Sequence, residues 1–106
     1  MTKLMRKLLY ATLAAASLAA AAEHEITQKD RAFSQTELTI KMGDSIVFKN
    51  LDEVTHNVFS VSPGMEFDIR RQAPGQSSSI AFQREGVAEI RCSIHPKMKL
   101  IVTVKK

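Results

Sequence analysis

The sequence predicts an all-β domain, a sandwich or a barrel, and three observations support this fold class. Short segments in which apolar and polar residues alternate fill the chain from about residue 24 to its end, and a period of two is typical of strands that bury one face. Turn signals separate these segments at Pro63-Gly64, Pro74-Gly75 and Glu85-Gly86. No segment has a convincing helical period, and many short strands at regular spacing indicate a sandwich or barrel.

The first 22 residues are expected to be a cleaved export signal. MTKLMRK carries three positive charges, LLYATLAAASLAA is an apolar run, and Ala20-Ala21-Ala22 provides the small residues that a signal peptidase needs. The alternative is a membrane anchor, but the apolar run is shorter than the roughly 20 residues that span a bilayer. We therefore expect residues 1–22 to be removed and residues 23–106 to form one periplasmic domain with no membrane attachment.

Removal of the signal changes the charge balance and argues against a nucleic-acid partner. The whole chain has 15 Lys+Arg against 11 Asp+Glu. Lys3, Arg6 and Lys7 lie in the signal, so 12 basic residues remain against 11 acidic ones. The chain has no Trp, and its one tyrosine, Tyr10, also lies in the signal, which leaves few side chains on which bases could stack.

The expected strands follow one another along the whole domain. Eight segments alternate or are rich in strand-forming residues: 24–28, 37–42, 45–50, 56–61, 66–70, 77–82, 86–91 and 99–105. In the second of these, Leu38, Ile40 and Met42 share one face, which is expected to face the core. Gly43-Asp44 then turns the chain into the third strand.

The same alternation places three sulfur- or nitrogen-bearing side chains on inward faces. Cys92 follows the strand 86–91 and shares a face with Ile90. Met98 shares its face with Leu100, and His56 shares its face with Val58. These side chains are therefore expected at the core-facing ends of their strands.

CSIHPKM, residues 92–98, combines a thiol, an imidazole and a thioether on a loop between the last two strands. Cys92 is the only cysteine, so it has no disulfide partner in its own chain, although exported proteins usually pair their cysteines. A bound metal would engage the thiolate and help to stabilise a domain of only about 84 residues. Thiolate and imidazole are strong ligands, and a thioether is a weak, soft ligand that favours copper.

A second imidazole has to come from elsewhere in the chain. His56 is the only histidine outside this loop and the N-terminal tail. Two histidines, one cysteine and one methionine form the ligand set of a blue-copper site. Pro96 fixes its own φ and has no N–H, which helps to hold His95 in one orientation.

Two segments, DSIVFKNLDEVTHNVFS (44–60) and CSIHPKMKLIVTV (92–104), resemble the cupredoxins, in particular small bacterial plastocyanin-like and amicyanin-like proteins. The resemblance covers about residues 36–106 and implies a Greek-key β-sandwich of about seven to eight short strands. It implies one type 1 copper ion, and the ligands that it implies are His56, Cys92 and His95 in equatorial positions and Met98 in the axial one. It also implies that Asn57 ties the two ligand segments together, toward Ser93.

This donor set is compatible with several functions. The favoured one is a monomeric type 1 copper protein, not an enzyme, that carries single electrons between periplasmic redox proteins, for example a c-type cytochrome or a dehydrogenase. The alternative is a periplasmic copper carrier, which would use the same soft ligands but release the ion readily. A hydrolase would need Cys92 as a nucleophile beside a histidine base. A structural zinc site would make poor use of Met98.

His24 offers a separate copper-binding possibility. Cleavage after Ala21 would leave Ala22-Glu23-His24 at the amino terminus, where it could form a Cu(II) chelate. The alternative is that His24 belongs to a disordered terminus without such a role.

The ring edge of His95 is expected to be the part of the copper site nearest the surface. Pro96, together with Pro63 and Met65 from another loop, is expected to form an apolar patch around it. The side chains of Lys97 and Lys99 are expected to supply a positive rim, which would act mainly on the rate of encounter with a partner.

Overall fold

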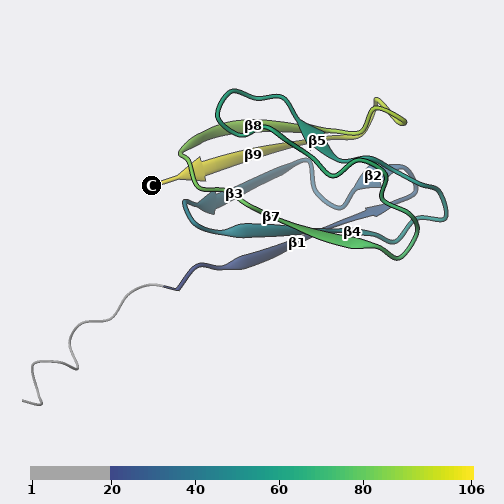
Figure 1. Ribbon diagram of the computed structural model, residues 1–106, viewed down its shortest axis with the longest axis horizontal. Coiled ribbons are helices and arrows are strands. Elements are labelled where there is room, and N and C mark those ends of the chain that lie inside the picture. Colours follow the sequence, from purple (N-terminus) through teal and green to yellow (C-terminus); the bar gives the residue numbers. More distant parts are fainter. Residues whose placement is uncertain (1–19) are drawn as a thin grey trace, which may run out of the picture.

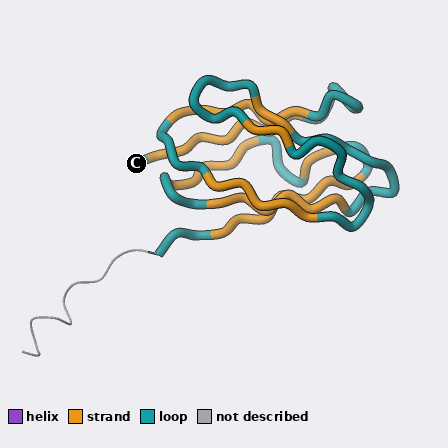
Figure 2. Tube along the Cα trace, viewed as in Figure 1, coloured by secondary structure: helices purple, strands orange, loops and turns teal. Residues whose placement is uncertain are grey.

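Two β-sheets face each other in this computed structural model, which describes residues 20–106 (Figure 1). The four-stranded sheet has the order β2-β1-β4-β7, and the five-stranded sheet has the order β3-β9-β8-β5-β6. The strands are β1 (Glu23–Lys29), β2 (Ala32–Phe33), β3 (Glu37–Lys41), β4 (Ser45–Asn50), β5 (Phe59–Ser60), β6 (Phe67–Asp68), β7 (Ser77–Ala81), β8 (Gly86–Arg91) and β9 (Lys99–Lys105). Loops and strands account for all of residues 20–106, without a helix (Figure 2). The predicted all-β sandwich is confirmed.

Pairings between strands distant in sequence connect each sheet. β1 lies parallel to β4, and β3 lies parallel to β9. β4 pairs antiparallel with β7, and β8 pairs antiparallel with β9. Because the chain passes repeatedly from one sheet to the other, the topology is of the Greek-key kind. The loops that follow β4 and β8 lie at the end of the sandwich opposite the C-terminus (Figure 1).

Three strands differ from the sequence-based expectation. The segment 56–61 forms only the two-residue β5 and a single bridge between His56 and Gln72. The segment 66–70 forms only β6, and β2 was not expected at all. Tertiary contacts rather than local alternation decide how far these short strands extend.

Side chains from the inward faces of both sheets form the core. Ile46 and Phe48 of β4 are fully buried, as are Leu100 and Val102 of β9, and burying a side chain of this kind contributes about 1.5–3 kcal/mol. The alternation predicted these positions correctly. It was wrong for Met42, which is 43% exposed because it lies one residue beyond the end of β3, in the turn to β4.

Asp44 connects the beginning of β1 to the turn between β3 and β4, at the end of the sandwich opposite the β8–β9 loop. Its carboxylate accepts hydrogen bonds from His24 Nε2 at 3.0 Å, the Ala22 N–H at 2.9 Å and the Lys41 N–H at 3.0 Å. These bonds, with that of His24 the largest contribution, lower the pKa of Asp44 to about 2. His24 belongs to an ordered strand, so an amino-terminal chelate would require its ring to leave this carboxylate.

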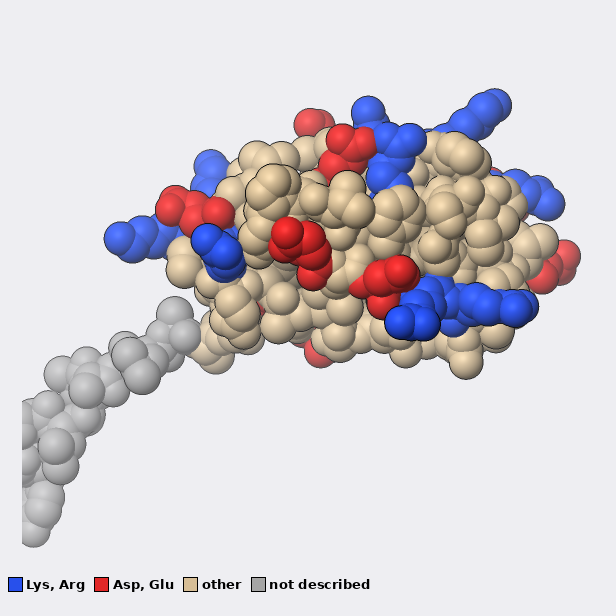
Figure 3. Space-filling model, turned by 45° about the horizontal axis from the view of Figure 1, so that its top comes forward, with Lys and Arg blue, Asp and Glu red and all other residues tan. Residues whose placement is uncertain are grey.

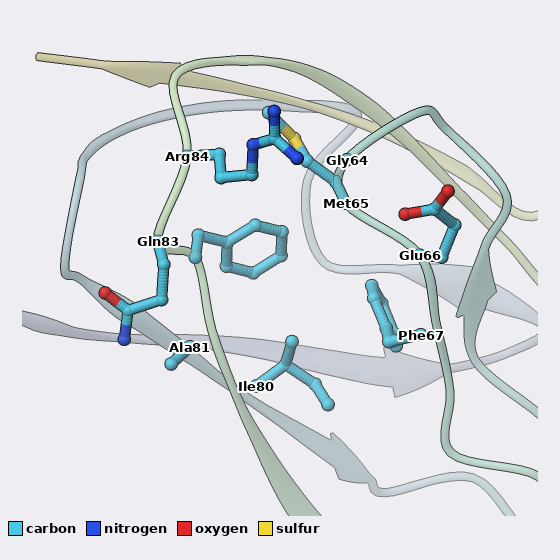
Figure 4. A pocket seen from close by; sticks show the side chains of 9 residues that line it. Gly64, Met65, Glu66, Phe67, Ile80, Ala81, Gln83 and Arg84 are labelled. Atoms are coloured by element: carbon cyan, nitrogen blue, oxygen red, sulfur yellow. The ribbon is translucent and has the colours of Figure 1, made fainter.

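Met65 also lies far from the β8–β9 loop. Its side chain is buried, and its Cε lies 2.7 Å from where a Cβ would stand on Gly86, the first residue of β8. Cys92 follows the other end of that strand, about 20 Å away at 3.3 Å per residue. Figure 4 shows Met65 in a pocket lined by residues 64–67 and 80–84. The expectation that Pro63 and Met65 surround His95 is therefore wrong.

The export signal expected over residues 1–22 falls on residues 1–19, which lie outside the described part of the chain, and on Ala20, Ala21 and Ala22. Within residues 20–106 no helix has the length and apolar character needed to cross a membrane.

Candidate metal centre

Three donor atoms meet at the end of the sandwich where β8 passes into β9. His56 Nδ1 lies 3.0 Å from His95 Nδ1 and 3.7 Å from Cys92 Sγ. All three donors lie within 4.8 Å of one another. His56 and Cys92 are buried, whereas His95 is partly exposed. The fold thus brings together the cysteine and the two histidines that the sequence analysis singled out.

The β8–β9 loop holds Cys92, His95 and Met98 through its own hydrogen bonds. Cys92 continues the inward alternation of β8 and is only 1% exposed. The Met98 N–H donates to the His95 carbonyl at 2.9 Å, and the Arg91 guanidinium donates to the Pro96 carbonyl at 2.9 Å. Met98 is 2% exposed, so its thioether lies inside the domain.

Asn57 joins the two segments that carry the donors. Its Oδ1 accepts hydrogen bonds from the N–H of Ser93 at 2.8 Å and from Ser93 Oγ at 2.9 Å. The N–H of Asn57 itself points to Cys92 Sγ at 3.5 Å. An N–H directed at the sulfur favours the thiolate form, which is the form that binds metals.

Asp52, a residue that the strand pattern of the sequence does not indicate, orients the His56 ring. Its Oδ2 lies 2.9 Å from His56 Nε2 and accepts a hydrogen bond from the Arg31 N–H at 2.8 Å. The bonds from Arg31 and then His56, with one from the Glu53 N–H, hold the pKa of Asp52 well below its usual range. Because an ionised carboxylate can only accept, Nε2 carries the proton and the Nδ1 lone pair faces Cys92 and His95.

The sequence contained an indication that Asp52 contacts His56. Metal-bound histidines usually donate their second ring N–H to a carboxylate or a carbonyl. Asp52 lies only four residues before His56. Alternation along strands does not reveal this contact, because residues 51–55 belong to no strand.

The donor set fits copper. Two imidazoles and a thiol with a methionine on the same loop are soft or intermediate ligands, whereas Mg²⁺ and Ca²⁺ prefer oxygen. The neighbouring carboxylate of Asp52 bonds to the far nitrogen of the His56 ring and does not face the cluster. Zinc makes poor use of a thioether, so Met98 favours copper over zinc.

The exposed edge of His95 lies in a shallow depression that Arg31, Ile94, Pro96 and Lys97 also line. Ile94 is 50% exposed. Arg31 reaches this end because the β1–β2 turn lies here, and its φ of 57° is typical of a tight turn. Figure 3 shows Lys and Arg side chains, with some acidic ones, around the end of the molecule that carries the β8–β9 loop. Arg31 was not expected from the sequence.

Comparisons with known proteins cover both segments that supply donors. The family model described as copper binding proteins, plastocyanin/azurin family, matches residues 20–105. Amicyanin-alpha from Methylorubrum extorquens is 32% identical over 103 residues, which cover 90% of this chain and 87% of that protein. Methylamine utilization protein MauL from the same organism is 30% identical over 83 residues, 77% of this chain and 73% of that protein.

Among solved structures, a purple cupredoxin from Nitrosopumilus maritimus superposes with a TM-score of 0.69 at 26% identity. The superposition covers 77% of this chain and 99% of that one. The similarity therefore extends over nearly the whole of a related domain and not over a local motif alone.

Proposed function

The chain belongs to the plastocyanin/azurin family of copper-binding proteins, the cupredoxins, and on this premise we propose that it carries single electrons through one type 1 copper ion. The observation that carries the proposal is the convergence of the His56, Cys92 and His95 donors within 4.8 Å. These three residues would hold the copper ion, together with Met98, which is buried at the end of the same loop.

A bound copper ion supplies one-electron chemistry by alternating between Cu(II) and Cu(I). The protein's part is to hold the ligands still while the charge changes. Asp52 fixes the ring of His56, and Asn57 joins its segment to the loop of Cys92 through Ser93. Ligands held in this way by hydrogen bonds need little rearrangement at each transfer.

The proposed partners are one redox protein that donates the electron and one that accepts it. Both would approach His95, because its ring is the exposed part of the donor cluster. The name of one relative, methylamine utilization protein MauL, supports partners that take part in the utilization of an amine. A dehydrogenase and a c-type cytochrome are the kinds of partner that we propose. We further propose a periplasmic monomer formed after removal of residues 1–22.

Catalysis by Cys92 is not part of this proposal. A nucleophilic thiol has to reach a substrate, and Cys92 is only 1% exposed. Its sulfur faces two imidazoles and the Asn57 N–H inside the domain. The protein is therefore proposed to transfer electrons without transforming a substrate.

Absorption spectroscopy tests the assignment directly. Adding Cu(II) to the purified apoprotein should produce an intense visible charge-transfer band from the Cys92 thiolate. Cys92→Ser should remove the band, because no other cysteine exists. Ser62→Ala, at a serine that bonds to the Glu89 N–H and is not one of the proposed ligands, should keep it. A folded copper adduct without this band would refute the site.

A second measurement separates electron transfer from copper carriage. The proposed electron carrier should retain its ion through repeated reduction and oxidation. Rapid loss of copper to an apo-acceptor protein would instead support the carrier function.

A further inference from the structure

Two glutamines form a hydrogen-bonded pair inside the domain. Gln28 of β1 is fully buried and Gln72 is 1% exposed. Gln28 Nε2 donates to Gln72 Oε1 at 2.6 Å, and Gln72 Nε2 donates to the Phe48 carbonyl of β4 at 2.9 Å. The pair therefore ties Gln72, which belongs to no strand, to two neighbouring strands of the four-stranded sheet.

Burying two amide side chains costs folding free energy in so small a core. A buried amide costs free energy unless its groups are hydrogen-bonded. Gln28 Oε1 is buried without a hydrogen-bond partner among the described residues. Apolar side chains of similar size could fill the same space without that cost. Stability alone therefore does not account for the pair.

The backbone of Gln72 is bound to the backbone of His56. The His56 N–H donates to the Gln72 carbonyl at 3.1 Å, and the Gln72 N–H donates to the His56 carbonyl at 2.6 Å. This is an isolated bridge, because β5 begins only at Phe59. Asn50 Nδ2 donates to the same Gln72 carbonyl at 2.9 Å. The position of the His56 backbone thus depends on the position of Gln72.

The His56 segment is attached to both sheets, because it leads into β5 of the five-stranded sheet and Asn57 bonds to Ser93. Cys92 and His95 lie on the connection between β8 and β9, which belong to the five-stranded sheet. His56 is bound through Gln72 to Gln28 and Phe48, which belong to the four-stranded sheet. Gln72 therefore adds an attachment of His56 to the four-stranded sheet, beside the direct Asn57–Ser93 bonds that join the two ligand-bearing segments.

We propose that Gln72, anchored by Gln28, is a positioning residue of the copper site. It holds the backbone of His56 at a constant distance from Cys92 and His95, while Asp52 fixes the orientation of the ring. The inference rests on the proposed copper function for its spectroscopic and kinetic readouts. It does not need copper for its hydrogen-exchange readout, because the bridge is present in the protein chain itself.

The test is the double variant Gln28→Met/Gln72→Met. Removing both partners of the Gln28–Gln72 bond with side chains of similar volume is nearly neutral. The Phe48 carbonyl also loses its Gln72 donor, so the variant should fold with a melting temperature a few degrees below that of the wild type. In the apoprotein, amide exchange at His56 should be at least about tenfold faster, because the bridge opens more often. In the copper form, release of the ion to a chelator should be about tenfold faster. The electron self-exchange rate should fall, and the visible and EPR spectra should shift.

Gln76→Met is the matched control. Gln76 lies in the same loop but is exposed, and its Oε1 accepts only from the Ala73 N–H, at 2.7 Å. This variant should match the wild type in His56 exchange, in copper release and in self-exchange. If the double variant does not fold, Gln28→Met alone carries the test. It removes one of the bonds that hold Gln72 and leaves those with Phe48 and Asn50, and it should still accelerate exchange at His56.

If the double variant folds but exchanges its His56 amide and releases copper at the same rates as the wild type, the proposal is overturned. Equal effects of Gln76→Met would also overturn it, since they would show a general response of the loop. If the wild type forms no coloured copper centre, the proposed function fails, but the exchange comparison in the apoprotein still decides the role of Gln72.

Discussion

His56 illustrates how much of the site depends on single contacts. Asp52 receives its Nε2–H, Gln72 holds its backbone, and the next residue, Asn57, bonds to Ser93 on the other ligand segment. Only Nδ1 remains free to face Cys92 and His95. A ligand restrained in this way loses little freedom when it binds a metal, so these contacts should contribute to affinity and to the rate of electron transfer.

Asp52→Ala should weaken copper binding about 10- to 100-fold, because the His56 ring loses the acceptor that fixes its orientation and tautomer. Competition with a chelator of known affinity measures this change. Glu53→Ala is the control, since Glu53 is an exposed neighbouring carboxylate. Equal copper affinities for Asp52→Ala and the wild type would show that Asp52 does not position the ligand.

Met98→Gln should keep a coloured copper centre but lower its reduction potential, because a weak axial ligand tunes the site without creating it. Protein-film voltammetry measures the potential. Met42→Gln, at an exposed methionine outside the core, should leave the potential unchanged. Complete loss of copper from Met98→Gln would show that the thioether holds the ion more firmly than an axial ligand does.

At the scale of elements, residues at the ends of strands hold both ends of the sandwich in place. β8 continues its alternation into Cys92, and β9 begins directly after Met98, so the hairpin carries Cys92 and Met98 on its inward face. At the other end, Asp44, the residue before β4, accepts hydrogen bonds from Ala22 and from His24 of β1. The same carboxylate therefore joins β1 to the turn between β3 and β4.

The Asp44 contacts predict a pH dependence of stability. The pKa of Asp44 falls from 3.8 to about 2 on folding, chiefly through the His24 hydrogen bond. A lowered pKa means that the ionised form stabilises the fold above about pH 4 and that this contribution is lost as pH falls toward 2. Wild type should therefore exceed Asp44→Asn in unfolding free energy at pH 5, and the difference should shrink between pH 4 and pH 2.

Denaturant titrations of the apoproteins across this pH range measure the effect. Glu37→Gln, which changes an exposed carboxylate at the beginning of β3, is the control and should show no comparable difference. A gap between wild type and Asp44→Asn that stays constant from pH 5 to pH 2 would contradict the assignment.

On the scale of the whole molecule, the two ends of the sandwich differ in character. One end carries the donor cluster, with Arg31, Ile94, Pro96 and Lys97 around the edge of His95. The opposite end carries the Asp44 contacts and the pocket with Met65. A redox partner that approaches the first end meets an apolar surface with positive charges beside it, which favours an acidic partner surface.

Lys97→Glu should slow electron transfer to an acidic partner at low ionic strength, and the difference from the wild type should shrink at high salt as the charges are screened. Stopped-flow measurements at two salt concentrations test this, with the reduction potential expected to stay nearly constant. Lys105→Glu is the control, because Lys105 is an exposed lysine at the far end of β9. Equal rates for Lys97→Glu and the wild type at both salts would remove Lys97 from the encounter.

The sequence by itself determined the all-β class, the inward direction of Cys92, Met98 and His56, and the donor set that selects copper. These follow from a period of two and from ligand chemistry, both of which are local properties of the chain. Met42 shows the limit of that reasoning, because alternation does not indicate where a strand ends. Only the tertiary structure decided that Asp52 and Gln72 hold His56, that Arg31 lies beside His95, and that Met65 lies at the opposite end. These contacts join segments from both sheets, and their loops have no period from which a pairing could be predicted.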